Sequence, residues 1–365
     1  MKHLLLLFFL LSVLTSTNAR QKSITIIAYY SGGPEQAAQL PAEKLTHIIF
    51  SFGHLKGNQF DIGSKRDSST IKNLVALKKR NPALKVILSL GGWGGCETCS
   101  DVFSTASARH EFALSVLKAN QYFKTDGLDL DWEYPAIEGP PGHAYKAEDK
   151  DNFTSLIKEL RTTLGKKSEI SFAAGGIKKF LDESVDWKAI IPLIDRVNMM
   201  TYDLVGGYSI RTGHHTPLYS TAEQPASTDY AIQYLIKQGV PASKLVLGAA
   251  FYGRMWEEVP SVNNGLYQSG KFKEFIDFKN FDTRFDANSG FTFYWDEVAK
   301  APYLYNAEKK LYVTYDDKKS MALKTQYAID NKLDGIMFWE LACDKEKDGL
   351  LDVIVNVKNE ARHKK

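Results

Sequence analysis

The chain has 365 residues, of which 44% are hydrophobic and 24% are charged, proportions typical of a globular protein rather than a disordered one. Its formal net charge is +3, and its lysines and arginines are scattered apart from a short basic end at residues 362–365. This near-neutral balance gives no reason to expect nucleic acid or another polyanion as a partner.

The first segment has the pattern of a secretory signal peptide. Lys2 and His3 precede an apolar run over residues 4–14, and Thr-Asn-Ala follows at residues 17–19. We expect cleavage after residue 19, which removes Lys2 and lowers the net charge from +3 to +2. The apolar run is shorter than the ~20 residues that span a bilayer, and no other stretch is long enough. We therefore expect a secreted, extracellular or periplasmic monomer without membrane contact.

Short β-branched or apolar runs recur along the chain, with amphipathic segments between them. Strands are expected at residues 25–29, 47–52, 85–90, 127–131, 169–174, 196–201, 244–250 and 335–339. Helices are expected at residues 68–80, 107–123, 150–164 and 227–238. Alternating strands and helices imply right-handed crossovers and a parallel sheet. Eight units predict an α/β fold, a closed (β/α)8 TIM barrel over residues 20–365, rather than a doubly wound open sheet.

The regular spacing breaks once, between the seventh and eighth predicted strands. The intervening chain is rich in aromatic residues, has short alternating runs at 290–295 and 310–315, and ends in a helical pattern at 320–332. A structureless loop of this length would be unusual in a compact domain. We therefore predict a small α+β insertion, about residues 255–313, between strand 7 and helix 7 of the barrel.

Residues 126–135 read Asp-Gly-Leu-Asp-Leu-Asp-Trp-Glu-Tyr-Pro. Alternate side chains of a strand share a face, so Asp129, Asp131 and Glu133 would point one way and the apolar residues between them the other. Like charges in one site raise at least one pKa, and a general acid must still be protonated near neutral pH. The alternative is an acidic loop that binds calcium or faces solvent, which the interleaved Leu and Trp do not favour.

Other predicted strand ends carry chemically distinctive residues. In a (β/α)8 barrel the catalytic groups lie at the carboxyl ends of the strands. These ends read Ser-Leu-Gly-Gly-Trp at 89–93, Met-Met-Thr-Tyr-Asp at 199–203, Phe-Tyr-Gly-Arg at 251–254 and Met-Phe-Trp-Glu at 337–340. Acids, tyrosines and tryptophans on one rim suit a carbohydrate, because rings stack on sugar faces while carboxylates and hydroxyls orient the sugar.

The acidic segment also matches a family motif, Asp-Gly-x-Asp-x-Asp-x-Glu. In this respect the chain resembles glycoside hydrolase family 18, in particular the chitinase branch that carries an α+β insertion. Further landmarks occur in the family order: Thr46-His47 leading to Phe52, Ser89-x-Gly91-Gly92, Met200-x-Tyr202-Asp203, Tyr252-Gly253-Arg254, Tyr315-Asp316-Asp317 and Gly335-Ile336-Met337-Phe338-Trp339.

The resemblance implies retaining hydrolysis of β-1,4-linked N-acetylglucosamine in chitin or chito-oligosaccharides, with the substrate's own acetamide as the nucleophile. Glu133 would be the catalytic acid and base, and Asp131 would hold the acetamide N–H. Asp129 would share a proton with Asp131, and Tyr202 would donate its hydroxyl to the acetamide oxygen. The chemistry needs no metal and no organic cofactor.

The same resemblance assigns substrate-binding residues. Trp339 would form the floor beneath the sugar at the cleavage site. The other predicted contacts are Tyr29, Phe52, Trp93, Met200, Asp203, Tyr252 and Arg254. The adjacent His214 and His215 are interpreted as surface or loop residues, because neighbouring positions do not share a face and form no zinc pattern.

Two other functions remain open at this stage. An endo-β-N-acetylglucosaminidase acting on N-glycans or peptidoglycan would use the same acid and the same acetamide. A non-hydrolytic, chitin-binding lectin would keep the cleft but typically lose the acid, and Glu133 is present here.

The three cysteines do not form a scaffold. Cys96 and Cys99 could form a local disulfide or stay reduced, and the sequence does not decide between these states. A zinc site or a redox role is not favoured, because no second Cys pair and no thioredoxin-like unit accompanies them.

Overall fold

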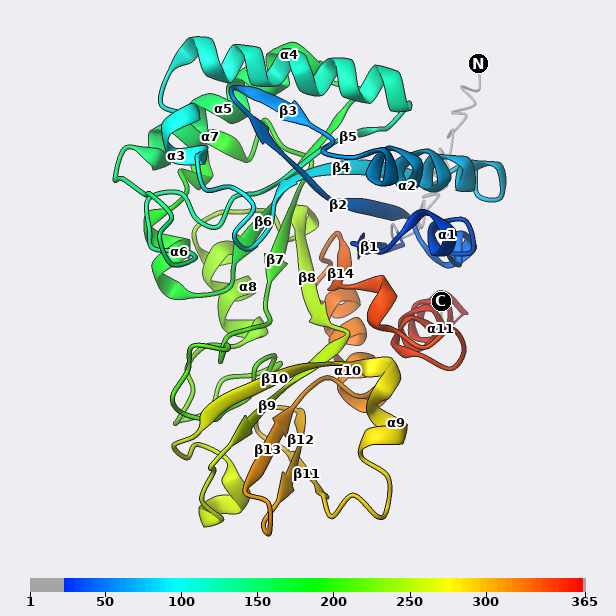
Figure 1. Cartoon of the computed structure of the whole chain (residues 1–365), viewed down its shortest axis with the longest axis vertical. Helices are drawn as coiled ribbons and strands as arrows, with labels where there is room; N and C mark the ends of the chain where they lie inside the picture. Colours follow the sequence, from blue (N-terminus) through cyan, green and yellow to red (C-terminus); the bar gives the residue numbers. More distant parts are fainter. Residues whose placement is uncertain (1–22, 364–365) are drawn as a thin grey trace, which may run out of the picture.

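A parallel barrel forms the larger part of the molecule (Figure 1). The computed structural model describes residues 23–363, so the predicted signal peptide lies outside the described residues. The barrel strands are β1 (Thr25–Tyr30), β2 (His47–Lys56), β4 (Lys85–Gly91), β5 (Gly127–Asp131), β6 (Glu169–Gly175), β7 (Arg196–Met200), β8 (Leu245–Ala250) and β14 (Gly335–Trp339). They pair in parallel in the order β1-β14-β8-β7-β6-β5-β4-β2, and the pairing of β1 with β2 closes the ring. The predicted (β/α)8 barrel is confirmed.

Strand alternation separates the inside of the barrel from its outside. Ile27, Ile87 and Met337 point inward and belong to a small apolar cluster within the ring. The residues that alternate with them along each strand point outward into one large core shared with the surrounding helices. Only β2 runs much beyond its prediction, because its end pairs in antiparallel fashion with β3 (Gln59–Asp61).

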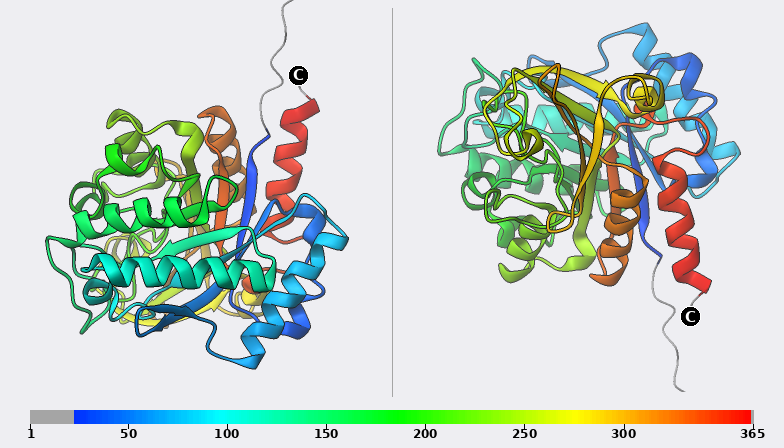
Figure 2. Two further views of the ribbon diagram at one scale, coloured as in Figure 1. Left: turned by 90° about the horizontal axis from the view of Figure 1, so that it is seen from above. Right: turned by 90° about the horizontal axis from the view of Figure 1, so that it is seen from below.

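Helices cover the outer face of the barrel (Figure 2). The longer ones are α2 (Lys65–Ala76), α4 (Ala106–Phe123), α5 (Asp149–Leu164), α8 (Thr228–Lys237), α10 (Lys318–Asp330) and α11 (Leu350–His363). Short helices lie in the connections: α1 (Pro34–Ala37), α3 (Cys99–Val102), α6 (Lys178–Glu183) and α7 (Trp187–Ile190). Side-chain caps such as Ser64, Thr105 and Ser227 begin three of the predicted helices. No helix in the described part of the chain is long and apolar enough to cross a membrane.

A second, antiparallel sheet lies at one end of the barrel strands (Figure 1). Its order is β10-β9-β13-β12-β11, and its strands are β9 (Tyr252–Glu257), β10 (Lys271–Asp277), β11 (Thr292–Asp296), β12 (Ala301–Asn306) and β13 (Leu311–Thr314). Its own apolar cluster includes Trp256, Leu266 and Tyr312, and the short helix α9 (Phe281–Arg284) follows β10. The sheet begins directly after β8, where the insertion was predicted. That residues 255–313 form a separate unit stays a prediction.

A buried ion pair ties this sheet to the barrel. Lys324 on α10 is fully buried, and its Nζ donates to both carboxylate oxygens of Asp316, which follows β13, at 2.8 and 2.6 Å. The same ammonium donates to the carbonyl oxygen of Thr216 at 2.7 Å, in the loop between β7 and α8. Removing one partner would leave an uncompensated buried charge. The pair therefore fixes the 212–218 segment against α10.

The structure answers the question that the cysteine spacing left open. Cys96 and Cys99 are joined in a disulfide that links the loop after β4 to the first residue of α3. Cys343 is free and buried.

Gly91 shows how closely β4 and β5 approach each other at the carboxyl end of the barrel. Its φ is +111°, and a Cβ atom there would lie 2.1 Å from the carbonyl oxygen of Asp131. That oxygen accepts a hydrogen bond from the N–H of Gly92 at 2.9 Å. The backbone that carries the central carboxylate therefore depends on a residue without a side chain.

Replacing Gly91 by Ala is expected to lower the free energy of unfolding by at least about 3 kcal/mol, because left-handed strain and a clash with backbone add together. The control is Gly57→Ala, where φ is +59° and no atom lies within 4 Å of the added Cβ. This second change should cost only about 1 kcal/mol, the strain alone. Denaturant unfolding of both variants measures the difference, and equal losses would contradict the proposed clash.

Candidate active site

The three acids of the β5 segment gather at the carboxyl end of the barrel, as the alternation predicted. Asp129, Asp131 and Glu133 are 0%, 5% and 9% exposed. The apolar residues between them, Leu128, Leu130 and Trp132, belong to the outer core. Burying like charges together is unfavourable, so their protonation must differ from that of free carboxylic acids.

Asp129 lies deepest and is surrounded by donors from four strands. It accepts hydrogen bonds from Tyr29 Oη at 3.0 Å, Ser89 Oγ at 2.9 Å, Ser171 Oγ at 2.6 Å and Asn198 Nδ2 at 3.0 Å. Burial raises the pKa of Asp129, and these four bonds oppose the rise because they favour the ionised form. The predicted contact residue Tyr29 therefore lies beside Asp129, with only 1% of its surface exposed.

Asp131 has the opposite environment. Its Oδ1 atom is buried without a hydrogen-bond partner among the described residues. Burial raises its pKa well above the ordinary value, and the charges of Glu133 and Asp129 raise it further. Both oxygens of Asp129 are engaged by the four donors, and no hydrogen bond between the two aspartates is seen in the described structure. The shared proton stays a prediction, and the observed coupling is electrostatic.

Glu133 lies two residues beyond the end of β5. Burial raises its pKa from 4.5 to about 7, a hydrogen bond from Tyr134 lowers it, and the charge of Asp203 raises it. An acid with this pKa is partly protonated at neutral pH, as a general acid needs to be.

Asp203 follows β7 and is paired with β9 of the second sheet. Arg254 binds both of its carboxylate oxygens, and Tyr252 Oη donates to Oδ1 at 2.7 Å. Burial would raise the pKa of Asp203, but hydrogen bonds with His215 and Arg254 and the guanidinium charge hold it well below its ordinary value. Asp203 therefore carries a full negative charge beside the acid.

His214 and His215 lie in the loop between β7 and α8, as expected, but they are not at the surface, so that part of the prediction was wrong. Both are fully buried. His214 Nε2 lies 3.0 Å from Asp296 Oδ2 on β11, and His215 Nδ1 lies 3.5 Å from Asp203 Oδ1. The second sheet covers this segment, which could not be read from neighbouring positions in the sequence.

Aromatic rings line the same end of the barrel. Trp339 stacks on Phe52, with ring centroids 5.6 Å apart and planes 12° apart, and its ring lies 6.0 Å from that of Tyr29. Trp93 is 50% exposed, and its ring lies 6.3 Å from that of Tyr134. Such rings can stack on sugar faces.

The two remaining predicted residues also lie near the acids. Met200, at the end of β7, is buried in the cluster inside the barrel. The ring of Tyr202 lies 6.2 Å from that of Tyr252. Burial raises the pKa of Tyr202 well above its ordinary value, and the charges of Asp131 and Glu133 add to this, so its hydroxyl stays a donor.

Sequence reasoning did not assign to the site five residues that lie beside its predicted members: Ser171, Asn198, Tyr134, Tyr208 and His215. The sequence contained a signal for Ser171, because this residue pairs in register with Asp129 and so faces the interior of the barrel as Asp129 does. Tyr208, on the loop after β7, is 72% exposed with its ring 6.1 Å from that of Trp93, and nothing local distinguishes it from any loop tyrosine.

Comparison with known proteins agrees with this geometry. The model of glycosyl hydrolases family 18 matches residues 25–344. The chain belongs to this family.

Two relatives that are named chitinases match most of this chain. Chitinase A1 of Niallia circulans is 36% identical over 308 residues, which are 77% of this chain and 43% of that protein. The matched region thus spans less than half of that relative. Chitinase B of Serratia marcescens is 28% identical, over 85% of this chain and 75% of that protein.

Solved structures of the family superpose closely. A family 18 N-acetylglucosaminidase from Paenibacillus barengoltzii has a TM-score of 0.84 and 36% identity, over 92% of this chain and 99% of that one. A chitinase from Bacillus thuringiensis has a TM-score of 0.87 and 29% identity, over 93% and 70%.

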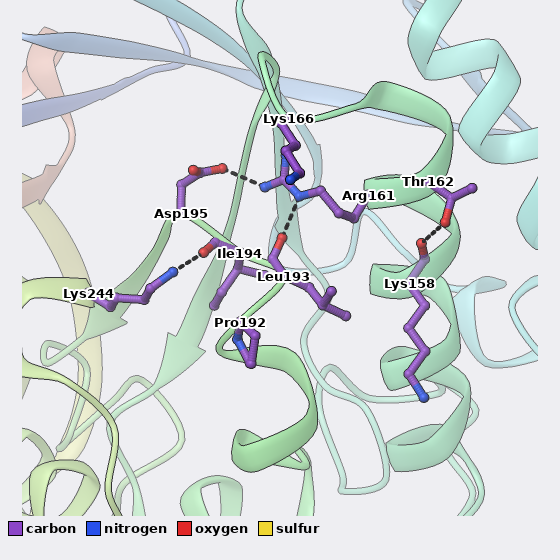
Figure 3. Close-up of a pocket in the computed structure, with 9 residues that line it drawn as sticks. All are labelled: Lys158, Arg161, Thr162, Lys166, Pro192, Leu193, Ile194, Asp195 and Lys244. Carbon is purple, nitrogen blue, oxygen red and sulfur yellow. Dashed lines mark hydrogen bonds and ion pairs between the residues drawn. The ribbon is translucent and has the colours of Figure 1, made fainter.

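A pocket of about 550 Å³ lies away from these acids, between α5, the start of β7 and the start of β8 (Figure 3). Two of its cationic residues, Arg161 and Lys244, form hydrogen bonds that stabilise the fold. Arg161 donates to the carbonyl of Leu193 at 2.6 Å and to Asp195 at 2.7 Å, while Lys244 donates to the carbonyl of Ile194. None of the predicted site residues lines it.

Glu133→Gln is expected to stabilise the protein at about pH 8, by roughly 1–3 kcal/mol. Because the pKa of Glu133 is raised from 4.5 to about 7 in the folded state, its contribution to stability is fully present below 4.5 and is lost as pH rises through 7. The neutral amide avoids this loss. Denaturant unfolding at about pH 4 and about pH 8 measures the change, and an equal difference at both would contradict a raised pKa.

Proposed function

We propose that the protein is a secreted, retaining glycosidase that hydrolyses β-1,4-N-acetylglucosamine linkages in chitin and chito-oligosaccharides by substrate assistance. The observation that carries the proposal is Glu133, a buried acid with a pKa of about 7, beside Asp131, whose Oδ1 has no partner among the described residues. The proposal that the chain is secreted rests on the basic, apolar and small-residue pattern of residues 1–19.

In the proposed first step, the proton of Glu133 passes to the glycosidic oxygen as the bond from that oxygen to the anomeric carbon breaks. The carbonyl oxygen of the sugar's own acetamide forms a bond to the anomeric carbon and gives an oxazolinium ion. The N–H of the acetamide donates to Asp131, which supplies the partner that Oδ1 lacks. Tyr202 donates its hydroxyl to the carbonyl oxygen and orients it for attack.

In the second step, water attacks the anomeric carbon and gives a proton to Glu133, which restores the starting state. The acetamide is released, and two inversions at one carbon retain the β-configuration. Asp129 is held beneath Asp131 by four donors that favour its ionised form, and its charge would help to stabilise the cationic intermediate.

The remaining site residues would bind the sugars. Trp339, fixed by its stacking on Phe52, would be the floor at the cleavage site, and the half-exposed Trp93 would contact a neighbouring sugar. Met200, Asp203, Tyr252 and Arg254 would complete the wall, where the last two hold Asp203 in place.

A second candidate is release of single N-acetylglucosamine units. It is favoured by the Paenibacillus N-acetylglucosaminidase, which matches 99% of its own length at 36% identity. An enzyme acting on N-glycans or peptidoglycan would share the same acid. The products of a defined oligomer separate these activities, because the bond that is cut depends on loop shape rather than on the acid.

Glu133→Gln is expected to lower kcat by about 10³-fold or more and to change KM only a few-fold, because the acid acts chiefly in the transition state. Steady-state hydrolysis of a chitin tetramer measures both constants. The matched control is Glu308→Gln on the exposed surface, which should behave like the wild type. A Glu133→Gln variant that still turns over would remove this residue from the mechanism, and wild-type binding without turnover would indicate a lectin.

The rate should also fall as pH rises above about 7. Glu133 must be protonated to act as the acid, and its pKa is about 7. The dependence of kcat/KM on pH measures this limb in the free enzyme. An alkaline limb near the ordinary glutamate value of 4.5 would mean that the buried environment does not control the acid.

A further inference from the structure

His215 is a buried histidine that none of the catalytic steps above uses. Its backbone is fixed on both sides, because its N–H donates to Thr314 Oγ1 at 3.1 Å and its carbonyl accepts from the N–H of Leu204 at 3.0 Å. Its ring lies against Tyr252, with centroids 5.2 Å apart. The side chain is 0% exposed, so the imidazole has one fixed location next to the proposed active site.

The polar contacts of this ring are few. Neither ring nitrogen has a hydrogen-bond partner among the described residues, and the nearest carboxylate oxygen, Asp203 Oδ1, lies 3.5 Å from Nδ1. A buried polar group without a partner costs free energy, so such groups are usually satisfied or functional. Hydrogen bonds in unliganded active sites are often long and tighten when substrate binds.

Charged groups surround the ring on several elements. Asp203 lies at the end of β7, Tyr252 and Arg254 on β9, and Asp316 after β13, where it is paired with Lys324 of α10. Burial lowers the pKa of His215, Asp203 raises it, Arg254 lowers it and Asp316 raises it, with a net decrease. The ring is therefore neutral near pH 7 and has one N–H to donate.

We propose that His215 is a positioning residue that donates its Nδ1–H to Asp203 and thereby holds this carboxylate toward the sugar at the cleavage site. The inference rests on the proposed function, because it specifies how a residue of the same site is aimed. The chemical role is that of a neutral donor that adds no positive charge beside Arg254.

The geometry explains why a further contact is needed. Arg254 and Tyr252 both come from β9, whereas His215 reaches Asp203 from the segment before α8. Asp203 itself has a φ of +55°, a left-handed conformation that neighbouring contacts must maintain, and its side chain is 37% exposed. Without His215 the carboxylate would be held from the β9 side alone and could turn away from the sugar.

A movement of the Asp203 carboxylate would also change the pKa of Glu133. The charge of Asp203 is one of the causes of the raised pKa of Glu133. If the carboxylate moves away, this repulsion weakens and Glu133 loses its proton at lower pH. A purely structural role for His215 would change stability without moving this limb.

The test compares His215→Leu, which has no donor, with His215→Asn, whose amide nitrogen can replace Nδ1. Hydrolysis of a chitin tetramer by the full chain is measured across pH. We expect His215→Leu to lower kcat/KM about tenfold, mainly through KM, and to move the alkaline limb down by roughly half a pH unit. His215→Asn should recover most of both effects. The matched control is His110→Leu, at an exposed histidine of α4 that pairs with Glu159 of α5. This change should alter neither kcat/KM nor the alkaline limb.

An unchanged pH limb and KM in a folded His215→Leu variant would overturn the proposal, as would equal losses in the Leu and Asn variants. If the Leu variant does not fold, as judged by circular dichroism, nitrogen-detected NMR of the wild-type histidines provides an independent test. The signal that His215→Asn removes should be a neutral Nδ1–H tautomer near pH 7. An Nε2–H tautomer or a charged ring there would overturn the proposal.

These outcomes are separate from failure of the proposed function. A wild type that cleaves no N-acetylglucosamine linkage would refute the glycosidase, while the NMR result would still report on the contact with Asp203. A wild type that is active with unaltered His215 variants would refute only the positioning role.

Discussion

The structure depends on the burial of three carboxylic acids, two on one face of β5 and the third two residues beyond its end. The interior of the barrel also holds apolar residues such as Ile87 and Met337, and water has little access to the acids there. Charges in such a place are unfavourable unless donors or neighbouring charges compensate them. Asp129 is compensated by four donors, Asp131 by none on Oδ1, and Glu133 by keeping its proton up to about pH 7. One short segment therefore holds three acids in three different environments.

The rest of the fold serves this arrangement. Gly91 allows β4 to approach the backbone of Asp131 closely. The second sheet contributes Tyr252 and Arg254 to Asp203, so it forms part of the candidate site as well as its wall. The buried pair of Lys324 and Asp316 fixes the segment that presents His215. Stability and the proposed chemistry thus share the same contacts, which is common where strained or buried polar groups carry function.

Much of the fold could be predicted from the sequence because strand alternation and helix amphipathicity are local signals. β5 and β14 have the predicted bounds, and α4 and α5 begin one residue before theirs. β2 ran further than predicted because its extension depends on β3, a partner that the alternation of β2 alone does not reveal. The three acids were found because one short segment of the sequence carries them all.

Other parts of the site depend on distant segments. The burial of His214 and His215 was not predicted, because the residues that cover them come from β11 and β13, far along the chain. Asn198 on β7 contacts Asp129 on β5 inside the barrel. The ring of Tyr208 contacts that of Trp93, which lies in the loop after β4. The catalytic roles, the shared proton and the signal peptide stay predictions, because they concern substrate, protons and residues outside the described part of the chain.

The central claim is that the buried Glu133 and an unpartnered Asp131 cleave N-acetylglucosamine linkages with the help of the substrate's acetamide. The most direct measurement is hydrolysis of a defined chitin hexamer, with the products followed by mass and by the anomeric configuration of the first-formed ends. The account predicts shorter N-acetylglucosamine oligomers that initially carry β-anomers. Initial α-anomers, or binding of the hexamer without cleavage, would contradict it.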